Sequence, residues 1–324
     1  MRYSRTDAKA YARANMRGIW AAALTPFTPA LAIDERGFRN NLRHWVDDLG
    51  IDGVFVSGKQ GEFFSMSLAE RKRSFEIAVD EIGGERTILS CSDQNMDTVV
   101  ELARHAQAIG SDYIVVHAPV LHFLNAQDET LVAYYRAISE RVDIGIALWS
   151  HPDSGYLMSP ELCARVAELS NVVAIKYSVP REMYAKLTRI AGDKLIVSTA
   201  SEDEWFDNIV ELGWQLYLCS SPPYLYQTKT DRRMRDYTDL ALRGEIARAR
   251  VVRDSLDPVR EAFKHSRPAE KFHAHSKYWQ DLLGQAGGGV RPPMLALTEA
   301  EKDITRHAFD ACGLKVPGVR SSAA

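Results

Sequence analysis

Asn171-Val-Val-Ala-Ile-Lys176-Tyr-Ser178 is an apolar, β-branched run that carries one lysine near its end. Continuous apolar runs of this length are typical of strands buried on both faces of a parallel sheet. A lysine there is costly unless its ammonium group has a partner or its amine a chemical purpose. If Lys176 is desolvated, its pKa falls and the neutral amine can attack a carbonyl carbon. If the strand ends at Lys176, the side chain instead reaches water or pairs with a carboxylate, and the run alone leaves both interpretations open.

Similar apolar runs recur along the chain in alternation with helical segments. Strands are predicted at 18–25, 53–57, 87–91, 113–117, 144–149, 172–176, 195–199 and 216–219. Helices are predicted near 35–49, 67–82, 97–109, 129–141, 159–169, 181–191 and 204–212, with mostly helical sequence over 223–312. Eight strand-helix units predict an α/β fold with right-handed crossovers. They favour closure into a (β/α)8 TIM barrel over an open sheet.

The flanking segments divide the chain further. Residues 1–17 are interpreted as an N-terminal extension outside the alternation, 18–225 as the barrel, 226–314 as a C-terminal helical subdomain and 315–324 as a tail. Two helix starts carry local signals. Ser67-Leu-Ala-Glu70 is a capping box, and Ser159-Pro160-Glu161 places proline at the first helical position.

Composition excludes several classes of protein. The chain has 324 residues and a formal net charge of −3, which gives no support for nucleic-acid binding or a polybasic membrane contact. No run approaches the roughly 20 apolar residues of a membrane span, and the first 17 residues lack the apolar core of a signal peptide. The four cysteines are far apart, so neither a zinc site nor a disulfide framework is expected. We therefore expect a cytoplasmic protein.

The active site of such a barrel lies at the carboxyl ends of its strands, so the residues there are the candidates. The second strand leads into Gly58-Lys59-Gln60-Gly61-Glu62, whose glycines let the backbone approach a carboxylate or phosphate, although a lone G-x-x-G is also an ordinary turn. Histidines stand at 117, 122 and 151, and a lone loop histidine is more often structural than catalytic. Lys176 ends the sixth strand. Ser201, after the seventh strand, is a further candidate for binding substrate.

Several motifs together resemble the dihydrodipicolinate synthase and N-acetylneuraminate lyase family. They are Thr25-Pro-Phe27, Gly58-x-x-Gly-Glu62 followed by Ser67-x-x-Glu-Arg71, Ala174-Ile-Lys176, Lys277-Tyr-Trp279 and Arg291-Pro-Pro-Met294. Their order and spacing cover about residues 18–314. The run Gly61-Glu-Phe-Phe-Ser65 is particularly similar to the 5-dehydro-4-deoxyglucarate dehydratase branch.

The resemblance implies class I chemistry without a metal or an organic cofactor. Lys176 matches the lysine that forms a Schiff base with pyruvate or another 2-oxo acid, and the resulting iminium acts as an electron sink. The backbone around Gly58, Lys59 and Gln60 matches the loop that grips the substrate carboxylate. The resemblance also implies a homodimer or homotetramer.

The chain departs from the family pattern at several positions. Trp149 stands where relatives carry a proton-shuttling tyrosine, and because an indole cannot relay a proton near neutral pH, His151, His117, water or the substrate must do so. The loop after the fourth strand reads Pro119-Val-Leu-His-Phe123 without the paired tyrosines of the synthases. Asp153-Ser-Gly155 lacks their carboxylate-binding arginine, and Lys59-Gln60 replaces two small hydroxyl residues.

These departures argue against a true dihydrodipicolinate synthase and against a standard sialic acid lyase. Phe63, Phe64, Phe123 and Trp149 either make the second-substrate pocket more aromatic or serve as packing. Lys59 either meets a second acid group of the substrate or binds Glu62. We expect a lyase, either an aldolase or a dehydratase. The alternatives are a 2-oxo-acid-binding or regulatory barrel that has lost turnover, and a decarboxylase, deaminase or isomerase that keeps the imine.

Overall fold

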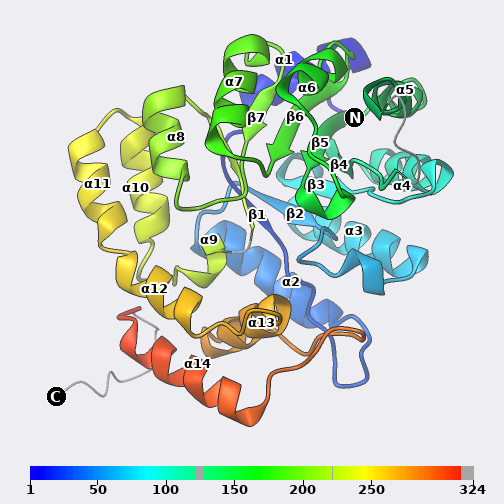
Figure 1. Ribbon diagram of the computed structural model, residues 1–324. Helices are drawn as coiled ribbons and strands as arrows, with labels where there is room; N and C mark the ends of the chain where they lie inside the picture. Colours follow the sequence, from blue (N-terminus) through cyan, green and yellow to red (C-terminus); the bar gives the residue numbers. More distant parts are fainter. Residues whose placement is uncertain (122–126, 221, 315–324) are drawn as a thin grey trace.

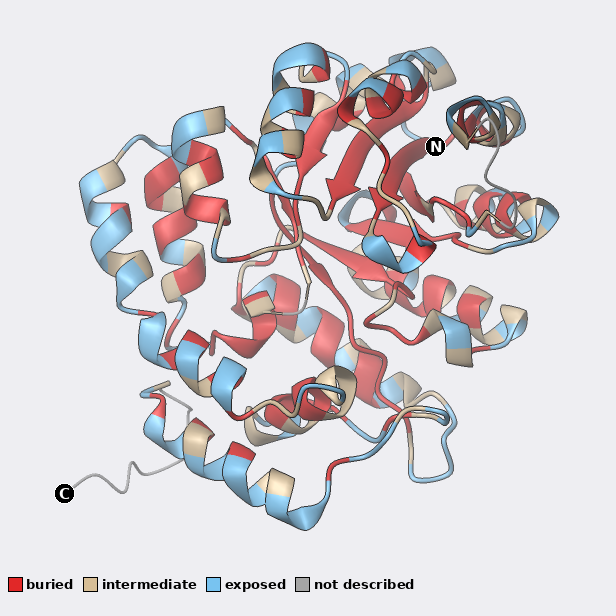
Figure 2. Ribbon diagram, viewed as in Figure 1, coloured by how far each residue is buried: buried red, intermediate tan, exposed pale blue. Residues whose placement is uncertain are grey.

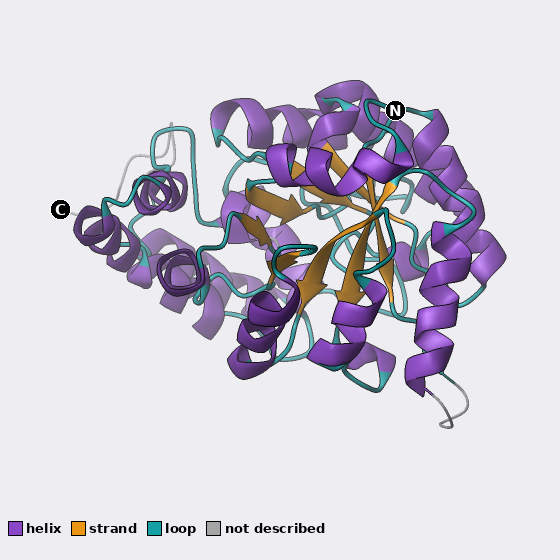
Figure 3. Ribbon diagram, turned by 90° about the horizontal axis from the view of Figure 1, so that it is seen from above, coloured by secondary structure: helices purple, strands orange, loops and turns teal. Residues whose placement is uncertain are grey.

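The computed structural model describes residues 1–121, 127–220 and 222–314, and it confirms the (β/α)8 prediction. Eight parallel strands form one sheet in the order β7-β6-β5-β4-β3-β2-β1-β8 (Figure 1). The strands are β1 (Gly18–Ala22), β2 (Gly53–Val56), β3 (Thr87–Ser90), β4 (Tyr113–His117), β5 (Gly145–Ser150), β6 (Val172–Tyr177), β7 (Ile196–Ser198) and β8 (Leu216–Leu218). Seen from above, the strands lie inside a layer of helices (Figure 3).

The barrel closes between β7 and β8, the two ends of the hydrogen-bonded order. At this seam the Leu218 N–H donates to Ser198 Oγ at 2.6 Å, and the Tyr217 hydroxyl donates to the Ala200 carbonyl oxygen at 3.2 Å. Side chains therefore connect the last two strands.

Burial of the strands explains their composition. Every residue of β6 is buried, because its inner face packs in the barrel and its outer face lies under helices (Figure 2). The surrounding helices expose their outer faces and bury the inner ones. They are α2 (Glu35–Arg43), α3 (Leu68–Ile82), α4 (Met96–Ala108), α5 (Gln127–Ser139), α6 (Pro160–Val166), α7 (Arg181–Ala191) and α8 (Trp205–Leu212).

Both predicted helix starts are present. Ser67 and Glu70 exchange the two hydrogen bonds of a capping box at the start of α3. Ser159 caps α6, whose first residue is Pro160. The helix expected to run through Leu49 is α2 followed by a π-helical turn, His44–Asp48.

The N-terminal segment packs against the barrel although it lies outside the strand-helix alternation. Its helix α1 (Ala8–Asn15) buries Ala8 and Ala12 in the same apolar cluster as Trp20 and Tyr113. Its polar contacts go to residues that precede strands: Arg13 donates to the Gly192 carbonyl oxygen, and Gln215 donates to the Arg13 and Met16 carbonyl oxygens. Helix α1 therefore covers the amino ends of the strands.

The C-terminal helices lie beside the barrel, with α10 and α11 next to α8 at the left of Figure 1 and α12, α13 and α14 in its lower part. They are α9 (Pro222–Leu225), α10 (Arg233–Leu242), α11 (Ile246–Asp254), α12 (Asp257–His265), α13 (Phe272–Leu282) and α14 (Glu299–Ala311). No helix among the described residues combines the length and apolar character that crossing a bilayer requires. The predicted tail, 315–324, lies outside the described residues.

Candidate active site

Lys176 is buried near the carboxyl end of β6, with 1% of its surface exposed. Its Nζ donates to the Cys219 carbonyl oxygen at 2.9 Å and lies 5.0 Å from the centroid of the Phe55 ring and 5.6 Å from that of Trp149. The alternative that this side chain reaches water or a carboxylate is wrong, because a backbone carbonyl and two ring faces surround the amine.

This environment changes the acidity of the amine. Burial lowers the pKa of Lys176 from 10.5 to about 8, with a smaller lowering effect from the charge of Lys59. The apolar surroundings disfavour the ammonium form. A useful fraction of Lys176 is therefore a neutral nucleophile near neutral pH.

The amine opens into a space of about 240 Å³ that we call the lysine cavity. Strands β5 and β6 contribute Trp149, His151, Lys176 and Ser178, and the loops after β2, β7 and β8 contribute Lys59, Gln60, Ala200 and Ser220. Phe272 and His273 of α13 complete its wall. The cavity therefore lies at the carboxyl ends of the strands, where barrels of this class hold their substrates.

The loop after β2 has an unusual backbone. Ser57 and Glu62 both have positive φ angles, 52° and 61°. A Cβ added at Gly58 would lie 2.6 Å from the Phe55 ring, so glycine is needed for this ring to stay beneath the amine. Gln60 donates to Ser220 Oγ at 3.4 Å, and its buried Oε1 has no hydrogen-bond partner among the described residues.

Lys59 is held by a carboxylate that the sequence did not indicate. Its Nζ lies 2.5 Å from Asp153 Oδ2, so this pair connects the loops after β2 and β5. The alternative that Lys59 binds Glu62 is wrong. Glu62 lies instead 2.5 Å from Lys277 Nζ of α13, and both side chains of that pair are completely buried.

The aromatic residues at the ends of β4 and β5 pack on one another. The ring centroids of Trp149 and His117 are 4.7 Å apart in an edge-on arrangement. Trp149 Nε1 and His117 Nε2 are buried without a hydrogen-bond partner among the described residues. Burial lowers the pKa of His117 to about 4, which keeps its ring neutral.

His151 lines the lysine cavity in a polar setting. Its Nδ1 lies 3.2 Å from the Asp153 backbone nitrogen and 3.2 Å from Asp153 Oδ1. Burial lowers the pKa of His151, against an opposing effect of the Asp153 carboxylate. His151 is thus a neutral acid-base group beside Lys176.

The sequence also makes His117, at the end of the fourth strand, a candidate for binding substrate, and the structure separates this residue and Ser201 from the residues around Lys176. His117 lines a neighbouring space of about 280 Å³ that we call the aromatic cavity. The apolar part of its wall is Phe63, Phe64, Ala118, Pro119, Val120 and Trp149, and the polar part is Lys59, Ser92, Asp93, Gln94, His117 and Asp153. Predictions that involve residues 122 and 123 lie outside the described residues.

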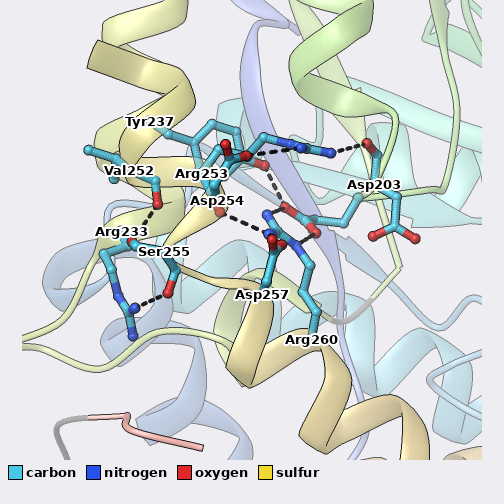
Figure 4. Close-up of polar contacts among 10 residues, drawn as sticks. Asp203, Arg233, Tyr237, Val252, Arg253, Asp254, Ser255, Asp257 and Arg260 are labelled. Atoms are coloured by element: carbon cyan, nitrogen blue, oxygen red, sulfur yellow. Dashed lines mark hydrogen bonds and ion pairs between the residues drawn. The ribbon is translucent and has the colours of Figure 1, made fainter. Parts of the chain in front are cut away.

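Ser201 lines a third space, also of about 280 Å³, which we call the polar cavity. Its wall includes Ser201, Glu202, Asp203, Arg260, Lys264 and Arg267. Glu202 accepts hydrogen bonds from Arg260 at 2.6 and 2.8 Å and from the Tyr237 hydroxyl at 2.6 Å. Arg260 also donates to Asp257 and to the Arg253 carbonyl oxygen (Figure 4).

Sequence reasoning missed one ring that contacts Lys176 and several residues that line the lysine cavity. Phe55 lies inside an ordinary apolar run, and Ser178 and Ser220 are single hydroxyl residues without a motif. Phe272 and His273 come from a distant helix. His273 Nε2 lies 2.9 Å from the Lys59 carbonyl oxygen, so α13 contacts the loop after β2 directly.

Metal ligation was also considered for the described part of the chain. No group of three or more His, Cys, Asp or Glu side chains among those residues is placed to hold a metal ion. The four cysteines are buried and free.

Comparison with known proteins gives consistent matches. The sequence profile of the dihydrodipicolinate synthetase family matches residues 15–311. The chain is 27% identical to 4-hydroxy-tetrahydrodipicolinate synthase of Methylobacterium radiotolerans, over 93% of this chain and 97% of the relative. It is 32% identical to N-acetylneuraminate lyase of Clostridium perfringens, over 58% of this chain and 65% of the relative. The crystal structure of dihydrodipicolinate synthase from Aquifex aeolicus has a TM-score of 0.81 at 20% identity, covers 93% of this chain and 100% of that chain, and shows likeness of fold alone.

Proposed function

Because the chain belongs to the dihydrodipicolinate synthetase family, we propose that it is a lyase in which Lys176 forms a Schiff base with pyruvate or another 2-oxo acid. Homologues named as a synthase and as a lyase of this family support the general class. The proposal covers both aldol cleavage or addition and dehydration.

One observation carries the proposal. Lys176 is a buried amine with a lowered pKa, and it opens into a cavity at the carboxyl ends of the strands. A buried lysine with no carboxylate partner destabilises a fold, so a chemical role explains its presence better than a structural one.

The first half of the reaction follows from this amine. Neutral Lys176 attacks the ketone carbon of the 2-oxo acid. The hydroxyl group of the resulting carbinolamine takes one further proton from solvent and leaves as water, which gives a positively charged iminium. The hydrogen bond to the Cys219 carbonyl orients the amine before attack. The backbone N–H groups of Lys59 and Gln60 hold the substrate carboxylate, while the ion pair with Asp153 fixes Lys59.

The second half requires a proton carrier. The iminium accepts the electron pair of the C3–H bond or of the C3–C4 bond, and an enamine results. We assign the proton transfers to His151, because it is neutral and lines the same cavity as Lys176. Trp149 forms an apolar wall and does not carry the proton.

The test is direct chemical trapping. Incubation with pyruvate and borohydride, followed by digestion and mass spectrometry, is expected to place the reduced adduct on Lys176. Lys176→Arg is expected to keep the fold and abolish both adduct and turnover, because a guanidinium stays protonated. A clean preparation that forms no Lys176 adduct with pyruvate or longer 2-oxo acids would refute the proposal.

The homodimer or homotetramer implied by the family resemblance stays a prediction. Light scattering on the purified full-length chain measures it directly. A monomer at working concentration would contradict it.

A further inference from the structure

The lysine cavity is bordered on one side by the aromatic cavity. The two share Lys59 and Trp149 in their walls, so the aromatic cavity adjoins the lysine cavity and lies in the direction of a ligand that extends from Lys176 along Trp149. A volume of about 280 Å³ exceeds the needs of one aromatic ring. The neighbouring space is therefore suited to the part of a substrate that lies beyond C3.

Aromatic pairs form much of this wall. Phe63 and Phe64 lie edge to face with ring centroids 5.7 Å apart, and Trp149 and His117 form the second such pair. The Arg71 guanidinium lies over the Phe63 ring at 5.3 Å and supports it from a buried position. Walls of this kind bind planar apolar groups through area and ring-edge contacts.

The charged residues of the same wall already have partners. Lys59 is the cation of the described wall, and Asp153 holds it. Asp93 lies 3.2 Å from the Arg71 guanidinium. A second carboxylate on the substrate would therefore find no unpaired cation among these residues, whereas an uncharged ring needs none.

The polar cavity borders the other side of the lysine cavity and is the rival location. It shares Ala200, Ser220 and Phe272 with the lysine cavity. Of its carboxylates, which also include Asp203 and Glu261, Glu202 is engaged by Arg260 and Tyr237 and is poorly placed to bind sugar hydroxyls. The wall of the polar cavity is rich in charged side chains, whereas half of the residues that line the aromatic cavity are apolar, so the aromatic cavity suits an uncharged ring better.

We propose that the aromatic cavity holds an aromatic, uncharged acceptor group, so that the enzyme adds pyruvate to an aromatic aldehyde or cleaves the corresponding product. This inference rests on the Schiff-base function proposed above. In the forward direction, the enamine carbon C3 forms a bond to the aldehyde carbon, the aldehyde oxygen takes a proton, and water releases the 4-aryl-4-hydroxy-2-oxo acid from Lys176. No oxidant or other co-reactant is needed.

The first measurement concerns binding rather than turnover. Borohydride trapping is followed with 2-oxobutanoate and with 4-phenyl-2-oxobutanoate, which differ by a phenyl group. We expect half-maximal trapping of the phenyl compound at a concentration at least tenfold lower. Val120→Asp and Phe64→Ala, which change the wall of the aromatic cavity, are expected to remove this preference and to leave trapping of pyruvate unchanged. Lys264→Ala, in the polar cavity, is the matched control and is expected to keep the preference.

The second measurement compares acceptors. With pyruvate as donor, benzaldehyde is expected to give a kcat/KM at least tenfold above that of glyceraldehyde. A pyruvate adduct together with no phenyl preference, or with preference for glyceraldehyde that Lys264→Ala removes, would overturn this inference and leave the proposed function intact. Absence of any adduct on Lys176 would overturn both.

Discussion

The pKa of one side chain, Lys176, determines how the proposed chemistry depends on pH. The reactive amine is the deprotonated form, which predominates above its pKa. Because burial lowers that pKa from 10.5 to about 8, adduct formation should rise with pH, about tenfold per unit below 8, and level off above it. Initial rates of inactivation by pyruvate with cyanoborohydride between pH 6 and 10 measure this. A rate that still climbs steeply above pH 9 would show that the amine is not desolvated.

His151 allows proton transfer to be tested apart from imine formation. His151→Asn removes the proposed acid-base group while Lys176 keeps its surroundings, so the pyruvate adduct should still form. Turnover should fall by about 10²- to 10⁴-fold, the usual contribution of a general acid-base group. His117→Asn is the comparison, since that ring lines the aromatic cavity instead. Equal losses in kcat for both variants would remove His151 from this role.

At the scale of elements, the pair formed by Glu62 and Lys277 fixes the loop after β2 to helix α13. Lys277→Met leaves the Glu62 carboxylate buried without its cation, and the free energy of unfolding should fall by about 3–5 kcal/mol. The double variant Glu62→Gln with Lys277→Met removes both charges and should recover most of that loss. Urea unfolding of the three proteins measures both quantities. A double variant no more stable than Lys277→Met would contradict the assignment.

The elements themselves were largely predictable from the sequence, whereas contacts between loops were not. The strand that carries Lys176 was predictable because a short, continuous, β-branched apolar run is typical of a strand buried on both faces of a parallel sheet. The partner of Lys59 was not, because Asp153 is distant in sequence and meets it only when β2 and β5 are placed around the same barrel. His273 was missed for the same reason: nothing in its neighbourhood distinguishes it from other residues of an amphipathic helix.

At the scale of the whole molecule, α1 seals the end of the barrel opposite the site. Ala12 is completely buried in the apolar cluster, whereas Ala10 of the same helix is exposed. Ala12→Asp should lower the free energy of unfolding by roughly 3 kcal/mol or more, because it places an unpaired charge in an apolar cluster. Ala10→Asp should cost about 1 kcal/mol or less, mainly through helix propensity. Comparable losses in denaturant unfolding would mean that α1 does not pack as described.

The contacts of α13 bear on how this barrel can be divided. Phe272 and His273 form part of the wall around the amine, and Lys277 neutralises a carboxylate in the loop after β2. The eight strand-helix units are therefore not a separable catalytic module to which later helices were merely appended. A shortened chain that ends after β8 would lose the cation that pairs with Glu62 and part of the wall of the lysine cavity. A chimera that takes these helices from a relative would have to restore both. A part of this chain that keeps the site intact must therefore include α13 as well as the barrel.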